Sequence, residues 1–373
     1  MTKILTVFGT RPEAIKMAPL ALALKDNADL DAKVCVTAQH REMLDQTLNT
    51  FDLKPDYDLD VMSKNQNLHD LSARIISGMR PVLLDYKPDV VLVHGDTLTT
   101  FCASTAAFFE HIKVGHVEAG LRSHNLSAPW PEEANRRVTS IFTNYHFAPT
   151  KTAEQNLLQE GQNADSITVT GNTVIDALLW MRDLIETSED YQNQLRRLFP
   201  FLETNRRMVL ITGHRRENFG SGFLNICAAI KMLAQTYPDL QLVYPVHLNP
   251  NVKGPVLELL DNLSNVYLIE PQDYAPFVYL MSQCYFVLTD SGGVQEEAPA
   301  LGKPVLVMRD TTERPEAVEA GTAKLVGTDV EKIVKHSKEL LDSQKIYDSM
   351  SMAINPYGDG NAVPRIIHVL KKC

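Results

Sequence analysis

Short runs of apolar, often β-branched residues alternate along the chain with longer stretches in which apolar residues recur at helical spacing. In the first half, the runs KILTVF, KVCVTA, DVVLVHG and KVGHVEA alternate with helical patterns that begin at Pro12, at Arg41 and near Thr99. The second half repeats this scheme with RMVLITG, LQLVYPVH, VYLIEP, YFVLTD and PVLVMRD. Such alternation is typical of βαβ units, whose parallel sheets carry ligand loops at the carboxyl ends of the strands. The pattern predicts the α/β class, with two Rossmann-like doubly wound domains.

The boundary between these domains is expected within residues 170–190. There the strand-like ITVTGN and the helical NTVIDALLWMRDLI give way to the polar stretch ETSEDYQNQ, without a low-complexity linker. We place the N-terminal domain at residues 1–171 and the C-terminal domain at residues 172–356. A short amphipathic helix is expected within residues 357–373, and its sequence alone leaves open whether it packs back on the first domain.

Composition agrees with two globular domains. The chain has 373 residues, of which 44% are hydrophobic and 22% are charged, and its length exceeds the usual size of a single core. The apolar run before Gly9 has only about five residues, too few for a signal peptide or a membrane span, so we expect a cytoplasmic protein. A net charge of -10 argues against general nucleic-acid binding but not against a small anionic ligand in a focused cleft.

The sequence gives no indication of a metal or a bound cofactor. The five cysteines are scattered without a CxxC pair, which predicts free thiols, and no histidines are spaced as HExxH or HxxxH. The turn after the first strand lacks GxGxxG, and the second strand ends in Thr37-Ala38-Gln39-His40, without the acid that would bind a nicotinamide ribose. We therefore expect no bound NAD. The cysteines are Cys35, Cys102, Cys227, Cys284 and Cys373.

Charged residues follow the strands of the first half. Arg11 and Lys16 flank the expected N-terminus of the first helix, where a phosphate is favoured; the alternative is that Arg11 caps a neighbouring helix. Asp96 and Glu118 each follow a buried parallel strand, which predicts that they enter the ligand crevice; the alternative is that each is a helix N-cap.

A proline-flanked segment, Pro129-Trp130-Pro131, precedes the next predicted helix. The prolines predict an extended approach, with Glu132, Glu133 and Arg136 on the first helical turn. Acids in a first turn are usually explained by the helix macrodipole. We accept that explanation for Glu133 and favour a functional role for Glu132.

Two motifs in the second half indicate diphosphate binding. His214, Arg215 and Arg216 follow one strand, and such a cluster favours an anionic partner; a salt bridge to Glu217 is the alternative. Ser291-Gly292-Gly293 follows another strand, before a helix expected from about Val294, and would present backbone N–H groups to a diphosphate. Glu297 would then accept the ribose hydroxyls. An ordinary tight turn remains the alternative for the glycines.

Taken together, these segments resemble the non-hydrolysing UDP-N-acetylglucosamine 2-epimerases over almost the whole chain. Ten blocks follow the order of that family: FGTRPEAIKMAPL, TAQHREMLDQ, HGDT, GHVEAGLR, PWPEEANR, TGHRREN, YPVHLNPNV, LTDSGGVQEEAP, GKPVLVMRDTTERPEA and NPYGDG. The resemblance implies a GT-B-like fold with two domains facing a central cleft, the C-terminal helix returning to the first domain, and a homodimer. It also implies conversion of UDP-N-acetylglucosamine to UDP-N-acetylmannosamine, for a bacterial surface polysaccharide.

The resemblance further assigns roles to individual residues. The catalytic residues would be Asp96, Glu118, Glu132 and His214, with the three acids surrounding the sugar; Asp96 and Glu118 would also bind substrate. UDP would be bound by Arg11, Lys16, His214, Gln272, Phe277, Ser291, Gly292, Gly293, Glu297 and Arg314. Some bacterial members also have an allosteric site, which would correspond to Gln39, His40, Arg215 and His247. Here Glu42 follows Arg41 where some regulated members carry glutamine, so this regulation is not expected.

The implied reaction eliminates UDP to give 2-acetamidoglucal and then adds UDP back, with proton transfer on each face of carbon 2. Which acid serves which face is left open. A GT-B glycosyltransferase that uses a UDP-sugar donor is the nearest alternative, and a hydrolysing epimerase and a catalytically silent sugar-nucleotide sensor are others. Neither a metal nor a nucleic acid enters any of these hypotheses.

Overall fold

The computed structural model describes residues 1–38, 41–63 and 66–373, and the chain divides into two compact units. Unit 1 comprises residues 1–177 and 357–373, and unit 2 comprises residues 178–356. The division falls inside helix α7 (Thr173–Thr187).

Unit 1 is built on a seven-stranded sheet whose pairings in the described chain are all parallel. From edge to edge the strands are β3 (Tyr57–Asp58), β2 (Leu30–Val36), β1 (Thr2–Phe8), β4 (Val90–His94), β5 (Lys113–Val117), β6 (Tyr145–Ala148) and β7 (Ile167–Val169). Its helices are α1 (Arg11–Lys25), α2 (Arg41–Thr50), α3 (Leu68–Tyr86), α4 (Leu98–Phe109), α5 (Glu132–Phe142) and α6 (Lys151–Gln159), with the 3₁₀ turn η1 (Ala164–Ser166).

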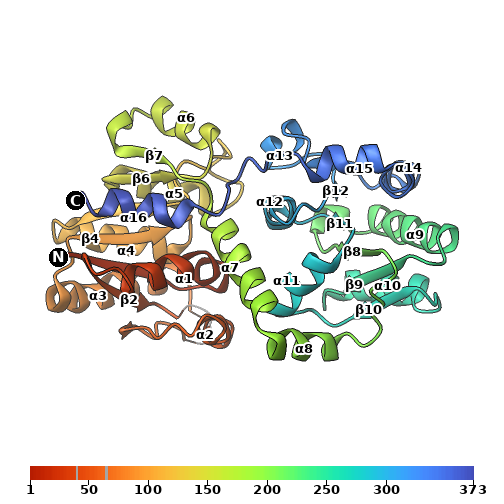
Figure 1. The fold of residues 1–373 in the computed structure, drawn as a ribbon. Coiled ribbons are helices and arrows are strands. Elements are labelled where there is room, and N and C mark those ends of the chain that lie inside the picture. Colours follow the sequence, from red (N-terminus) through yellow and green to blue (C-terminus); the bar gives the residue numbers. More distant parts are fainter. Residues whose placement is uncertain (39–40, 64–65) are drawn as a thin grey trace. The chain divides into compact units, whose positions relative to one another are not determined.

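The central strands of unit 1 are covered by helices (Figure 1). Helices α3, α4 and α5 are successive neighbours in one row, and α2, α1 and α16 (Ala362–Leu370) in another. Every residue of β4 is buried, as are the last five residues of β1. Strands that are covered on both faces need apolar residues at successive positions, which is why these two appear in the sequence as continuous apolar runs.

The chain returns to unit 1 at Tyr357. The backbone N–H of Asn172 donates to the carbonyl oxygen of Tyr357 at 2.7 Å, and α16 packs against α1. The Asp176 carboxylate accepts the N–H groups of Ala362 and Val363 at 3.2 and 2.9 Å, at the N-terminus of α16. The last helix is thereby fixed to the same unit as the first.

Unit 2 repeats the architecture with a six-stranded parallel sheet. Its strands, in spatial order, are β10 (Val266–Ile269), β9 (Gln241–Pro245), β8 (Met208–Thr212), β11 (Phe286–Thr289), β12 (Val305–Val307) and β13 (Ala323–Leu325). Its helices are α8 (Glu189–Leu198), α9 (Ser221–Thr236), α10 (Pro250–Leu260), α11 (Tyr274–Gln283), α12 (Gly292–Ala300), α13 (Pro315–Glu319), α14 (Val330–Asp342) and α15 (Gln344–Ser351), with the 3₁₀ turn η2 (Arg216–Asn218).

The predicted doubly wound α/β class is confirmed in both units, and all nine apolar runs named above form strands. Three further strands were not predicted: β3, β6 and β13. They contain two, four and three residues, and their sequences, YD, YHFA and AKL, are not the continuous apolar runs from which the other strands were predicted. The polar stretch after α7 forms the amphipathic helix α8, capped by Ser188, whose hydroxyl accepts the N–H of Tyr191.

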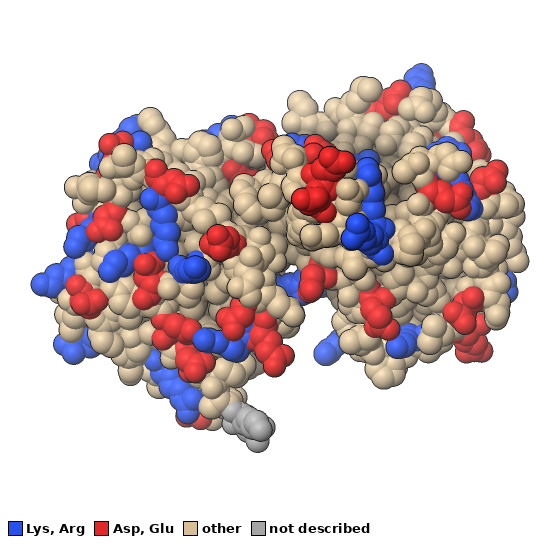
Figure 2. All heavy atoms as spheres, turned by 60° about the horizontal axis from the view of Figure 1, so that its bottom comes forward, with Lys and Arg blue, Asp and Glu red and all other residues tan. Residues whose placement is uncertain are grey.

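The remaining features concern the cysteine thiols, the apolar length of the helices and the distribution of charge on the surface. All five cysteines are free thiols as predicted, and the first four are buried, although Cys284 lies just after α11 rather than in a helix or strand. No helix in the described part of the chain is long and apolar enough to cross a membrane. On the face drawn in Figure 2, Lys and Arg are interspersed with Asp and Glu rather than gathered into a basic surface.

Candidate active site

Strand order reverses once in each sheet, and the candidate residues follow the strands at these two positions. In unit 1 the reversal lies between β1 and β4, and in unit 2 between β8 and β11. Loops that leave adjacent strands in opposite directions open a crevice at their carboxyl ends. Arg11 and Asp96 follow β1 and β4, and His214 and Ser291 follow β8 and β11.

Glu118 directly follows β5 and is nearly buried. Its Oε2 atom is 2.5 Å from the Lys16 ammonium and accepts the Asn172 side-chain amide at 2.9 Å. Its backbone has φ of +64°, a left-handed conformation that residues other than glycine rarely adopt. Glu118 is therefore a buried, ion-paired acid rather than a helix N-cap. Lys16 is its partner in the ion pair.

His94 lies beside Glu118 as a buried neutral ring. Its Nε2 atom is 3.7 Å from Glu118 Oε2. Burial lowers the pKa of His94 to about 4, despite the opposing effect of the Glu118 carboxylate. Burial also lowers the pKa of His116, on the neighbouring strand β5, to about 3. Both rings are uncharged at neutral pH.

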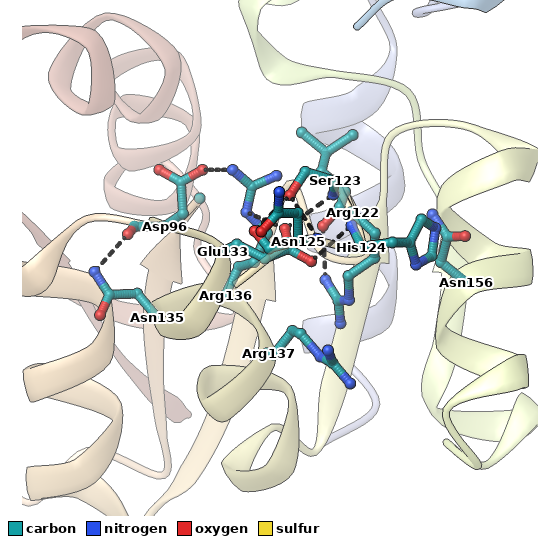
Figure 3. Close-up of polar contacts among 12 residues, drawn as sticks. Asp96, Arg122, Ser123, His124, Asn125, Glu133, Asn135, Arg136, Arg137 and Asn156 are labelled. Carbon is teal, nitrogen blue, oxygen red and sulfur yellow. Dashed lines mark hydrogen bonds and ion pairs between the residues drawn. The ribbon is translucent and has the colours of Figure 1, made fainter. Parts of the chain in front are cut away.

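Asp96 is held from α5 by two side chains (Figure 3). Its Oδ2 atom is 2.7 Å from the Arg136 guanidinium, and Asn135 donates to its carbonyl oxygen at 3.0 Å. The N-cap of α4 is Thr97, whose hydroxyl accepts the N–H of Thr100, so Asp96 is not an N-cap either. Burial raises the pKa of Asp96, Arg136 opposes this, and the carboxylates of Glu118 and Glu132 raise the pKa further. Glu118 and Glu132 thus both act electrostatically on Asp96.

Glu132 and Glu133 begin α5 as predicted, whereas Arg136 lies on the second turn. The approach is a series of turns, and its last residue, Pro131, has φ of -92° and ψ of 10°, so it is not extended as predicted. Glu133 is fully buried and accepts the N–H groups of Ser123 and His124 at 2.9 and 3.2 Å (Figure 3). The macrodipole therefore does not suffice to explain Glu133, which also anchors the preceding loop.

Arg11 is the first residue of α1, one residue before the predicted start, and Glu13 fixes the turn that precedes it. Glu13 Oε2 accepts the N–H groups of Gly9 and Thr10 at 3.0 and 2.8 Å, and its Oε1 accepts the Thr97 hydroxyl at 2.7 Å. Burial raises the pKa of Glu13, and these hydrogen bonds oppose the shift. Glu13 therefore connects the turn after β1 to the turn that carries Asp96.

Unit 2 has a pocket of about 290 Å³ at the carboxyl end of its sheet. Six of the residues that the sequence resemblance assigned to UDP line it, namely His214, Gln272, Phe277, Ser291, Gly293 and Glu297. Thr212, Gly213, Pro245, His247, Pro271 and Val294 complete the lining. The pocket thus combines an aromatic face, hydrogen-bonding groups and one carboxylate.

The Ser-Gly-Gly turn forms the N-terminus of α12 at this pocket. The helix begins at Gly292, two residues before the predicted Val294, because Ser291 is the N-cap. The Ser291 side chain makes no capping hydrogen bond, so the first N–H groups of α12 have no side-chain cap from this residue. A carbon atom added to Gly293 would have its nearest neighbour at 4.0 Å, Glu297 Oε2. An anion can therefore approach the backbone closely here.

Asp290 organises the loop that carries His214 and Arg215. Its Oδ2 atom accepts their N–H groups at 2.9 and 2.8 Å, and the Asn218 side-chain amide at 3.2 Å. Glu217 pairs with Arg309 at 2.5 Å, so the salt bridge considered for the two neighbouring arginines is not observed. Burial lowers the pKa of His214, opposed by the Asp290 charge.

The remaining assigned residues have different environments. Arg314 is the N-cap of α13 and is bonded to Glu296, outside the pocket lining. Gln39 and His40 lie outside the described residues. His247 stacks on His214 with ring centroids 5.4 Å apart, and Arg215 NH2 would be 3.6 Å from a carbon atom added to Gly292. His247 is therefore part of the pocket lining, and Arg215 lies beside the Ser-Gly-Gly turn.

Comparison with known proteins defines the family. The sequence model of the UDP-N-acetylglucosamine 2-epimerase family matches residues 22–371. The UDP-N-acetylglucosamine 2-epimerase of Escherichia coli (strain K12) is 58% identical over 99% of this chain and 98% of its own. The chain belongs to the UDP-N-acetylglucosamine 2-epimerase family.

Solved structures of 2-epimerases match the whole chain. The crystal structure of UDP-GlcNAc 2-epimerase from Neisseria meningitidis, bound to UDP-GlcNAc, is 55% identical with a TM-score of 0.90, and all of each chain is covered. The Methanocaldococcus jannaschii enzyme, in complex with UDP-GlcNAc and UDP, is 34% identical with a TM-score of 0.79 over all of each chain. These comparisons favour the 2-epimerase family over the glycosyltransferase alternative.

In this member of the 2-epimerase family, several site residues were not predicted. Asn172 bonds to Glu118, Arg136 to Asp96, and Asp290 to the loop at His214. Asp290 directly follows a buried strand, the signal that identified Glu118, and could have been found in this way. Among the described residues, no group of three or more His, Cys, Asp and Glu side chains is arranged to hold a metal ion.

The buried histidines predict a loss of stability in mild acid. The unfolded His94 ring binds its proton near pH 6.5, whereas the folded ring does so only near pH 4. Between these values the unfolded state binds more protons, so stability falls as the pH falls through this window. We expect His94 alone to lower the free energy of unfolding by about 2 kcal/mol between pH 7.5 and 5.0.

Urea unfolding at the two pH values measures this effect, with a His94→Gln variant as the comparison. Glutamine cannot take up the proton, so the variant should lose less stability than the wild-type protein over the same interval. An equal loss in both proteins would contradict the assignment of a neutral, buried His94.

Proposed function

We propose that this chain interconverts UDP-N-acetylglucosamine and UDP-N-acetylmannosamine by inverting carbon 2 of the sugar. The observation that carries the proposal is the group of three acids in unit 1, in which the charges of Glu118 and Glu132 both act on Asp96. The unit 2 pocket, with its uncapped helix N-terminus, supplies the chemistry that a nucleoside diphosphate requires. Relatives with bound UDP-GlcNAc and UDP support the substrate class.

The reaction proceeds by elimination and addition. The hydrogen on carbon 2 of a closed pyranose is not adjacent to a carbonyl group, so a carboxylate alone would remove it very slowly. Departure of UDP from carbon 1 creates an oxocarbenium-like centre, which acidifies this hydrogen, and loss of the proton gives 2-acetamidoglucal. Return of UDP, with protonation of carbon 2 from the opposite face, gives the epimer.

Departure of UDP requires stabilisation of the diphosphate charge. Within unit 2, His214, Ser291 and the N–H groups of Gly292 and Gly293 serve this purpose. Glu297 accepts the ribose hydroxyls, and Gln272 and Phe277 contact the uridine. Arg314 acts indirectly, because its guanidinium is bonded to Glu296, the neighbour of Glu297.

Proton transfer at carbon 2 requires one acid or base on each face. Asp96 is suited to exchanging a proton with carbon 2. Burial and two neighbouring carboxylates raise its pKa, and Arg136 opposes this shift. Glu118 is ion-paired with Lys16, which favours a carboxylate that receives a proton. Glu132, at the start of α5, is the third participant.

Substitution of each acid by its amide tests these roles. We expect Asp96→Asn, Glu118→Gln and Glu132→Gln to lower turnover by roughly 10²-fold or more, the usual contribution of a general acid or base. The protein is incubated with UDP-N-acetylglucosamine in heavy water without an acceptor, and NMR follows an epimeric UDP-sugar deuterated at carbon 2. Asp165→Asn, in the exposed turn η1, is the control. Full activity of all three variants, or no epimer from the wild-type protein, would refute the proposal.

Gly293→Ala tests the diphosphate site. Gly293 does not have a left-handed backbone and the added carbon meets no close neighbour, so folding should be unaffected. The methyl group would nevertheless occupy the space through which the phosphate approaches the helix, and we expect UDP affinity to fall by at least about tenfold. Calorimetry measures the affinity, and Gly254→Ala in α10, where an added carbon meets open space, is the matched control. Equal affinities would count against this site.

We propose in addition that the protein is a homodimer, as the family resemblance implies. Support comes from an exposed apolar cluster in unit 1, formed by Phe108, Phe109, Ile141 and Phe142. Phe109 and Ile141 are 64% and 72% exposed, and the rings of Phe108 and Phe142 stack with centroids 4.9 Å apart. Apolar clusters of this kind on a surface mark association sites.

Light scattering should give a mass of two chains for the wild-type protein and of one chain for Ile141→Glu. The charge would have to be desolvated within an apolar interface, which is costly. Ile354→Glu, at a residue of unit 2 that is 86% exposed, should remain dimeric. A dimeric Ile141→Glu variant would exclude this cluster as the interface.

A further inference from the structure

Asp290 is the one buried acid at the unit 2 pocket whose two oxygens have very different environments in the described structure. The side chain has no exposed surface, and Oδ2 accepts three N–H donors, from His214, Arg215 and Asn218. Oδ1 is equally buried but has no hydrogen-bond partner among the described residues. A buried acceptor without a donor is costly, so this oxygen favours any hydrogen that can reach it.

The side chain that can supply this hydrogen is His214. Its Nδ1 atom is 3.7 Å from Asp290 Oδ1, slightly beyond hydrogen-bonding distance, so a small movement of the ring brings the two together. A neutral imidazole carries one hydrogen, on one nitrogen or the other. The carboxylate therefore selects the tautomer with the hydrogen on Nδ1, which leaves a lone pair on Nε2.

The charges around His214 keep the ring neutral in the free protein. Burial lowers its pKa, the Asp290 carboxylate raises it, and the neighbouring His247 and Arg215 lower it again. His247 stacks on the ring, Arg215 is the next residue, and Glu297 lines the same pocket. His247 Nδ1 accepts the N–H of Asn249 at 3.1 Å, so a neutral His247 carries its hydrogen on Nε2.

A nucleoside diphosphate raises the proton affinity of the His214 ring, because it brings only acceptor oxygens and negative charge. The lone pair on Nε2 of a neutral His214 would repel a phosphate oxygen, whereas a second proton on the ring would convert it into a charge-assisted donor. Asp290 permits the change, because it accepts the Nδ1 hydrogen in both protonation states and neutralises the new charge. The added proton comes from solvent.

We propose that Asp290 and His214 form a proton-linked pair, in which binding of a nucleoside diphosphate to the unit 2 pocket draws one proton from solvent onto the His214 ring. Asp290 acts as a positioning residue that sets which nitrogen carries hydrogen before and after binding. This inference rests on the proposed function only in taking the unit 2 pocket as the diphosphate site.

Calorimetric titration with UDP, in buffers of different ionisation enthalpy at about pH 8, measures proton uptake directly. UDP is fully ionised there, so the uptake reports on the protein. We expect the wild-type protein to take up close to one proton, and its affinity to fall up to about tenfold for each unit that the pH rises.

Asp290→Asn is the decisive variant. The amide oxygen still accepts the three N–H donors, but the amide nitrogen now donates to Nδ1, so the neutral ring carries its hydrogen on Nε2 and binds phosphate without protonation. We expect proton uptake near zero and affinity that no longer varies with pH. Asn218→Ala, which removes one donor from Asp290 but keeps its charge, should retain the uptake of the wild-type protein.

The ring nitrogens provide a second readout. In ¹⁵N spectra of histidine-labelled protein, identified by loss of the signal in His214→Asn, the free ring should show hydrogen on Nδ1, and the UDP-bound ring hydrogen on both nitrogens. Hydrogen on Nε2 in the free protein, or equal proton uptake in the wild-type protein and Asp290→Asn, would overturn the inference while leaving the pocket assignment intact. Failure of the wild-type protein to bind UDP would instead remove the pocket assignment, and the inference with it.

Discussion

A buried carboxylate that accepts two successive backbone N–H groups recurs four times among the residues that the structure describes, and the positions of the site residues depend on it. Glu13 binds the N–H groups of residues 9 and 10, Glu133 those of 123 and 124, Asp290 those of 214 and 215, and Asp176 those of 362 and 363. A carboxylate is costly to bury unless its oxygens are bonded, and hydrogen bonds to a charged acceptor are roughly twice as strong as neutral ones. Each pair of hydrogen bonds therefore fixes the conformation of a loop that would otherwise be held only at its two ends.

The acids assigned to catalysis are held differently from these framework acids. Asp96 and Glu118 are paired with the cationic side chains of Arg136 and Lys16. A framework acid holds its loop through hydrogen bonds from the backbone, whereas a working acid must exchange a proton. Partners that are side chains allow proton exchange, because their charges change the proton affinity of the acid without fixing the conformation of a backbone loop. Asp290 is the exception that combines both arrangements, since one oxygen is in the framework and the other faces His214.

Much of the fold could be predicted from the sequence because parallel strands covered on both faces need uninterrupted apolar runs. The central strands β1, β4, β8 and β11 were found in this way, and the residues that follow them became the candidate site. The short strands β3, β6 and β13 were missed because their residues, YD, YHFA and AKL, do not form a continuous apolar run. In a fold of this class, strands are predicted best from the sequence where their residues are most deeply buried.

The partners of the site residues were harder to predict than the residues themselves. Asn172 and Glu118 are 54 positions apart, and Asp290 and His214 are 76 positions apart, so no local spacing reveals these contacts. Arg314 was assigned to UDP, and the structure shows that its guanidinium is also bonded to Glu296, a contact that no local spacing reveals. Glu133 was attributed to the helix dipole because its position on the first turn is visible in the sequence, whereas the loop it binds is not.

The return of the last helix to unit 1 has a consequence for how the protein is made. Helix α16 packs against α1, so the row of α2, α1 and α16 lacks a member until residues 362–370 have left the ribosome. Residues 178–356 emerge as one continuous segment before then, and domains generally fold as units during synthesis. Unit 1, most of which is translated first, is therefore the unit that is completed last.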